Sequence, residues 1–146
     1  MEIDDVARTL KSIPLFANLD VSKLKLLAFA SDRLTFDDQE VIFETGDAAD
    51  AAYLIESGAA DVYVTEGERQ IKVNELGKND LFGEMALFLK SGRSATVAAQ
   101  GTLVAMKLEG ELFLSMVTEN PDAALGVMTA LSEKIVHASE QIAKNA

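Results

Sequence analysis

Glycines recur about every ten positions through the middle of this 146-residue chain and separate short runs of apolar or alternating residues. Such runs are typical of strands, and glycine favours the turns that connect them. The spacing therefore predicts an antiparallel barrel or sandwich, with a hairpin tip at Glu66–Glu68. The glycines are Gly46, Gly58, Gly67 and Gly77, and the runs are Val41–Phe43, Ala52–Ile55, Ala60–Val64, Ile71–Val73 and Ala95–Ala98.

Helices are expected on both sides of the strands. Before them, Asp4 or Asp5 is predicted to cap a helix that ends near Lys11, and Pro14 interrupts the chain because proline disfavours helix in the residue before it. A second helix is expected after Asp20 or Ser22, with Leu24, Leu27 and Ala28 on one face. After the strands, helices are predicted at about 109–118 and from Pro121 towards Ala146. Helices, strands and helices without a linker predict one α+β domain.

The composition excludes several classes of function. A formal net charge of −11 disfavours binding to DNA, RNA or an anionic membrane. A single histidine rules out multi-histidine metal sites. A Mg²⁺ or Ca²⁺ site made of carboxylates alone stays open, but the chain has neither a calcium-loop spacing nor a glycine-rich phosphate loop with lysine, so no metal is expected. The chain has no cysteine, begins with acidic residues and has no apolar run of membrane-spanning length, which predicts a cytoplasmic protein.

Residues 82–97 differ from the rest of the chain and are compatible with an anion-binding loop. Gly83 lets backbone approach a ligand, and the amides that begin a short helix over Glu84–Leu89 favour phosphate. Arg93 would supply a two-pronged donor and Ser94 a hydroxyl, whereas the Glu84 carboxylate suits a sugar hydroxyl beside the phosphate. The alternative is a surface ion pair between Glu84 and Arg93.

Phe82–Leu87, five further residues and Arg93–Val97 together resemble the phosphate-binding cassette of the cyclic nucleotide-binding domain family. This is the domain type of the catabolite activator protein and of protein kinase regulatory subunits. Two other stretches support the likeness, which extends from about Leu10 to Ile142. They are Phe43-x-x-Gly46-Asp47 with Tyr53-Leu-Ile-x-x-Gly58, and Ile13–Phe16 with Leu19 and Leu24.

The resemblance implies one cyclic nucleotide-binding domain over residues 1–146. Its expected form is an antiparallel β-roll or jelly-roll barrel over 35–108 that contains the cassette at 82–97. N-terminal helices would occupy 1–34 and two lid helices 109–146.

The resemblance also implies the ligand contacts. Arg93 would pair with the phosphate, assisted by Ser94 and by amides around Ala86 and Ala95, while Gly83 and Glu84 would hold the ribose 2′-hydroxyl. Barrel valines would lie against ribose and base, and Ser139 would approach the adenine edge. The whole expected set is Gly83, Glu84, Met85, Ala86, Arg93, Ser94, Ala95, Val62, Val73 and Ser139.

The ligand is expected to be cAMP, with cGMP as the alternative. Ser94 is compatible with both nucleotides, because its hydroxyl can contact a guanine amine or serve the phosphate alone. Ala138 stands where the catabolite activator protein carries a threonine that reaches the adenine edge. This departure weakens the inference about base recognition.

We expect a non-catalytic sensor that moves its last helix and acts on an unidentified effector protein or domain. Residues spaced four and three apart on that helix predict either a homodimer seam or packing on the chain's own barrel. The alternative function is the ligand-binding part of a truncated cAMP-dependent transcription regulator, because four residues after Ile142 leave no room for a DNA-binding domain. A phosphodiesterase is disfavoured, since no metal cluster or placed base accompanies the cassette. A scaffold that has lost its ligand is also disfavoured, because Glu84 and Arg93 are both present. The seam residues are Ala124, Met128, Leu131, Ile135, Ala138 and Ile142.

Overall fold

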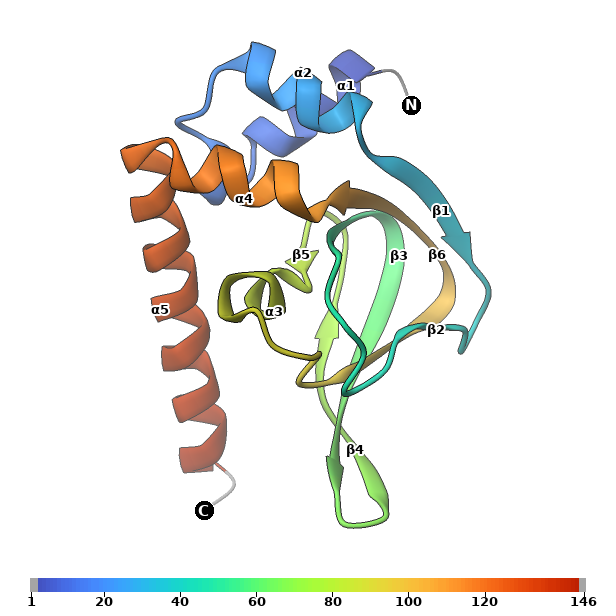
Figure 1. The fold of residues 1–146 in the computed structure, drawn as a ribbon. Coiled ribbons are helices and arrows are strands. Elements are labelled where there is room, and N and C mark those ends of the chain that lie inside the picture. Colours follow the sequence, from blue (N-terminus) through green and yellow to red (C-terminus); the bar gives the residue numbers. More distant parts are fainter. Residues whose placement is uncertain (1–2, 145–146) are drawn as a thin grey trace. The chain divides into compact units, whose positions relative to one another are not determined.

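The computed structural model describes the backbone of residues 3–144, and the side chains of that range except 14 and 141–144 (Figure 1). The chain forms two compact units. One unit comprises residues 30–114, and the other comprises the N-terminal residues up to Phe29 together with the residues from Ser115 onward.

The unit of residues 30–114 is built on one antiparallel sheet. The hydrogen-bonded order is β1-β6-β3-β4, with β2 also paired to β6 and β5 to β3. Within the described residues this path does not close on itself, so the sheet is rolled rather than a closed barrel. The predicted α+β class and antiparallel roll are confirmed. The strands are β1 (Asp32–Phe36), β2 (Val41–Phe43), β3 (Ala51–Glu66), β4 (Arg69–Leu76), β5 (Leu81–Phe82) and β6 (Thr96–Glu109).

Strand β3 continues through Gly58, so the prediction of two strands separated by a turn there is wrong. Gly58 has a φ of +86°, and a Cβ on it would lie 2.3 Å from the backbone oxygen of Thr102. The register against β6 shifts on both sides of Ser57. Gly58 therefore marks a bulge where the backbone of β6 approaches closely, which is the other common reason for glycine within a strand.

The ends of the strand region also differ from the expectation. Residues 32–34 were expected among the N-terminal helices but belong to β1, which pairs with β6 from Asp32↔Lys107 to Phe36↔Leu103. Strand β6 continues to Glu109, well past the run that predicted it. Both differences arise because pairing with a distant strand extends elements beyond their locally apolar stretches. The β3–β4 turn at Gly67, with a φ of +64°, lies where the hairpin tip was predicted.

The core of this unit lies between the inward faces of the strands. Its largest members come from β1, β3, β5 and β6, and they include Phe36, Tyr53, Ile55, Phe82 and Leu103. Ile42 and Phe43 of β2 pack against this cluster while remaining partly exposed. The core therefore brings the end of β2 beside the start of the cassette.

The other unit is helical, as predicted. It contains α1 (Ile3–Lys11), η1 (Pro14–Phe16), α2 (Val21–Phe29) and α5 (Pro121–Lys144), and α4 (Gly110–Thr118) crosses the boundary between the units. Helix α1 begins before Asp4 and Asp5, so these residues lie in its first turn rather than at its cap. Asn120 caps α5, because its Oδ1 accepts hydrogen bonds from the amides of Asp122 and Ala123 at 3.0 and 3.2 Å.

Helix α5 packs against η1 and buries Ala123 and Val127. Two members of the predicted seam, Met128 and Ile135, are 58% and 64% exposed, and the side chain of Ile142 lies outside the described residues. No helix within residues 3–144 combines the length and apolar character needed to cross a bilayer.

Candidate ligand-binding site

The cassette begins at Gly83, which precedes the six-residue helix α3 (Glu84–Leu89). Gly83 is the N-cap residue with a φ of 82°, and no side chain caps the helix. At the other end, Lys90 adopts a left-handed conformation and its amide donates to the Ala86 carbonyl. The first-turn amides of α3 therefore remain without a side-chain acceptor at the cap.

Arg93 returns from the far end of the cassette to its beginning. Its Nη1 donates to the Gly83 carbonyl at 2.5 Å, and its Nη2 donates to the Ala51 carbonyl at 2.7 Å. The Arg93 amide donates to the Asp47 carbonyl at 2.8 Å, and the Gly46 amide donates to the Arg93 carbonyl at the same distance. Backbone and side chain of Arg93 are thus fixed both to the start of the cassette and to the distant stretch 46–51.

The Arg93 guanidinium lies over an aromatic ring. Its Cζ is 4.1 Å from the ring centroid of Phe43, a cation–π geometry. The rings of Phe43, Tyr53 and Phe82 form one cluster, with Tyr53 and Phe82 stacked at 5.3 Å between centroids. A planar cation is therefore supported on one face by a rigid aromatic layer.

The charge of Arg93 is only partly compensated by the protein. Arg93 is 4% exposed, and this burial lowers the pKa of its guanidinium, while the charges of Asp50, Asp47 and Glu84 oppose that shift. Burial also raises the pKa of the neighbouring Tyr53 phenol, with Asp50 adding to the effect. The Nε of Arg93 is buried and has no hydrogen-bond partner among the described residues. An anion at this atom would satisfy both the buried donor and the buried charge.

Glu84 is buried as deeply as Arg93, at 5% exposure. The alternative of a surface ion pair between them is therefore wrong, because neither side chain lies at the surface. Glu84 is buried on α3 together with Ala86 and Leu87, whereas Arg93 is buried against Phe43 and the carbonyls of Ala51 and Gly83. The structure thus brings Gly83, Glu84, Ala86 and Arg93 together.

The remaining residues of the predicted set are more exposed. Met85 and Ser94 are exposed, and Ala95 is half-buried. Val62 packs against the core cluster, whereas Val73 is 50% exposed beside a register shift in the β3–β4 pairing. Ser139 is exposed on α5 and belongs to the other compact unit.

Phe43 and Tyr53 were expected only as parts of a strand motif, and their place beside Arg93 was not predicted. An aromatic residue three positions before Gly46 is the only signal that could have suggested this contact for Phe43. The carbonyls of Ala51 and Gly83, which accept hydrogen bonds from Arg93, are backbone groups, so no pattern of side chains could predict them.

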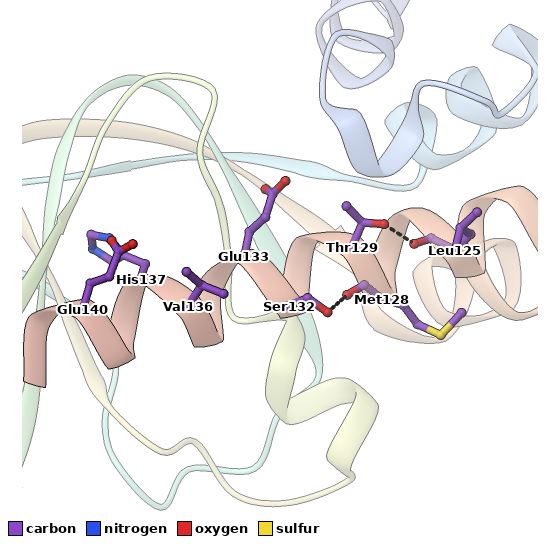
Figure 2. A pocket seen from close by; sticks show the side chains of 8 residues that line it. All are labelled: Leu125, Met128, Thr129, Ser132, Glu133, Val136, His137 and Glu140. Carbon is purple, nitrogen blue, oxygen red and sulfur yellow. Dashed lines mark hydrogen bonds between the residues drawn. The ribbon is translucent and has the colours of Figure 1, made fainter. Parts of the chain in front are cut away.

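Concave surfaces in the described part of the chain include one beside the cassette and one on α5. A cavity of about 650 Å³ borders the cassette at Ala86, Ser91 and Gly92, and residues from the segments 46–50 and 109–114 also line it. A shallow groove of about 540 Å³ runs along α5 alone (Figure 2). The groove is lined by Leu125, Met128, Thr129, Ser132, Glu133, Val136, His137 and Glu140. No group of metal-ligating side chains large enough to hold an ion occurs in the described residues.

Comparison with known proteins identifies the family profile that this arrangement matches. Residues 33–120 match the profile of the cyclic nucleotide-binding domain. The chain is 36% identical over 95 residues to a cAMP-dependent protein kinase type II regulatory subunit of Drosophila melanogaster, covering 65% of this chain and 25% of that protein. The chain thus spans about a quarter of the length of the curated relatives it matches.

Solved structures support the same relationship. The regulatory domain of Toxoplasma gondii protein kinase A with cAMP superposes with a TM-score of 0.78 at 26% identity, covering 89% of this chain and 50% of that one. The Thermus thermophilus catabolite activator protein superposes with a TM-score of 0.75 at 28% identity, covering 88% and 61%.

Proposed function

This chain belongs to the cyclic nucleotide-binding domain family, and we propose that it binds cAMP in preference to cGMP as a non-catalytic regulatory module. One observation carries the proposal. Arg93 is a buried cation whose Nε donor has no partner among the described residues, at the position where the resemblance expects the phosphate. A cyclic nucleotide offers a monoanionic phosphodiester that matches one such charge.

Different cassette residues contact different groups of the ligand. Arg93 pairs with the phosphate, while amides around Met85, Ala86 and Ala95 and the Ser94 hydroxyl donate to it. Glu84 accepts the ribose 2′-hydroxyl bond, and the tight turn at Gly83 lets the ribose approach the backbone. The apolar sides of ribose and base then lie against Val62 and Val73 of the roll.

Two relatives support the preference for cAMP. The Drosophila relative is named as cAMP-dependent, and the Toxoplasma structure contains cAMP. Ser94 is compatible with both nucleotides, so another residue must distinguish the bases. Ser139 is the candidate for this contact with adenine.

The output is a change in α5 that an effector protein or domain detects. A ligand shifts a conformational equilibrium only by binding one state better. Helix α5 is suited to such a role because four of its apolar residues are largely exposed, and burying them against a second copy would form a homodimer. These residues are Leu125, Met128, Ile135 and Val136. The alternative is the ligand-binding part of a cAMP-dependent transcription regulator, supported by the likeness to a catabolite activator protein.

Calorimetric titration with cAMP and with cGMP tests the proposal. From the size of the ligand we expect a dissociation constant of about 10 µM or lower for cAMP. We expect cGMP to bind more weakly. If neither nucleotide binds at about 100 µM, the proposal is overturned, because this concentration lies well above the expected dissociation constant. Recovery of intact cAMP after incubation is expected, whereas hydrolysed product would establish an enzyme.

Two further measurements test the output. Hydrogen exchange in α5 should slow on saturation with cAMP, and unchanged exchange would exclude the proposed movement. Light scattering with and without cAMP decides whether the chain is a homodimer.

A further inference from the structure

Phe43, the last residue of β2, lies beneath the Arg93 guanidinium rather than only in the core. We propose that Phe43 is a positioning residue that holds Arg93 in its anion-binding orientation before a ligand arrives. This inference rests on the proposed function, because it assigns a role within the same site.

The contacts of Arg93 leave one edge of its guanidinium available. Guanidinium carries five N–H donors in a fixed plane. Nη1 donates to Gly83 and Nη2 to Ala51, so each terminal nitrogen uses one of its hydrogens. The Nε–H and one hydrogen of Nη2 form the side-on edge of the guanidinium, which is a fork that phosphate oxygens accept. Within the described part of the chain, the Nε atom has no hydrogen-bond partner.

The two carbonyls alone leave the plane free to tilt about the line that joins them. The face of Phe43, 4.1 Å from Cζ, removes this freedom on one side. The space beside it is also tight, because a Cβ on Gly83 would lie 2.8 Å from Nη1 of Arg93 and 3.3 Å from Cε2 of Phe43. Ring, carbonyls and turn thus hold the guanidinium in one orientation.

Preorganisation of this kind affects ligand affinity. Without the ring, the guanidinium plane would tilt about its two carbonyl contacts in the free protein and would be immobilised when the phosphate binds. Immobilising one such side chain corresponds to roughly a two- to tenfold loss of affinity. Because the effect passes through the phosphate, it should be equal for every cyclic nucleotide that the site accepts.

The test compares Phe43→Leu and Phe43→Tyr with the control Phe36→Leu. Phe36 belongs to the same core cluster, but the guanidinium stacks on Phe43. We expect Phe43→Leu to lower the affinities for cAMP and cGMP by the same factor of about two to ten. Phe43→Tyr and Phe36→Leu should both bind with the affinity of the wild-type protein. In a double-mutant cycle, the loss should shrink on an Arg93→Lys background, because lysine lacks the planar fork.

A second measurement needs no ligand. In the nuclear magnetic resonance spectrum of the free protein, the Arg93 Nε–H should be shifted by the ring and slow to exchange, and both properties should disappear in Phe43→Leu. An unchanged Nε–H signal in that variant would overturn the proposal, as would equal affinities of Phe43→Leu and Phe36→Leu for cAMP. If the wild-type protein binds neither nucleotide, the proposed function fails, and the Nε–H signal still decides whether Phe43 holds Arg93.

Discussion

Replacing Arg93 by methionine should separate ligand binding from folding. Methionine keeps a flexible apolar stem and removes the charge together with the donors to Gly83 and Ala51. Losing one partner of a buried charge pair costs about 2–5 kcal/mol, so cAMP should bind roughly 30- to 4,000-fold more weakly.

The free energy of unfolding should change much less than the free energy of binding. Each hydrogen bond from a charged donor contributes about 1.5–3 kcal/mol. The variant loses two of them, but it also no longer buries a cation, which costs several kcal/mol of desolvation. These opposing contributions largely cancel in the free protein, whereas the phosphate of the bound ligand loses its counter-charge entirely.

The assay pairs calorimetry with urea unfolding on the same samples. Arg69→Met is the control, because Arg69 is exposed at the start of β4 and its replacement removes the same charge from a chain with a net charge of −11. We expect the control to bind cAMP normally. A folded Arg93→Met variant that retains cAMP affinity within about threefold of the control, which is less than 1 kcal/mol, would refute the assignment of Arg93 to the phosphate.

Three other predictions concern neighbouring positions. Gly83→Ala and Gly67→Ala should each lose about 1–2 kcal/mol of stability, because both positions have a positive φ. Only Gly83→Ala should weaken cAMP binding, because a Cβ at position 83 would displace the Arg93 side chain, whereas a Cβ at position 67 would meet open space. Glu84→Gln should weaken cAMP by about fivefold and leave the affinity for 2′-deoxy-cAMP unchanged; an equal loss for both ligands would exclude contact with the ribose. Burial raises the pKa of Tyr53 above 10.0, so the stability linked to the neutral phenol is complete below pH 10.0 and is lost as the pH rises above it. Tyr53→Phe should therefore make the unfolding free energy fall less steeply above that pH, and an unchanged slope would contradict the shift.

Local patterns were informative where one segment decides its own structure. Helix α5 begins at the predicted Pro121, and the hairpin turns at Gly67, because a proline at a helix start and a glycine with positive φ act through neighbouring residues. The same local reasoning failed at Gly58. Its requirement comes from the Thr102 carbonyl on β6, 44 positions away, and no pattern within β3 reports that approach.

The candidate site divides in the same way. The sequence by itself determined which residues form the cassette, since Gly83, Glu84, Arg93 and Ser94 occur in one short motif with a specific spacing. Only the tertiary structure decided how Arg93 is held. Phe43 and the Ala51 carbonyl reach it from 50 and 42 positions away, through the pairing of β2 and β3 with β6. The physical reason is that a motif records which groups are available, whereas the orientation of a buried cation depends on ring faces and backbone carbonyls that only a folded sheet brings together.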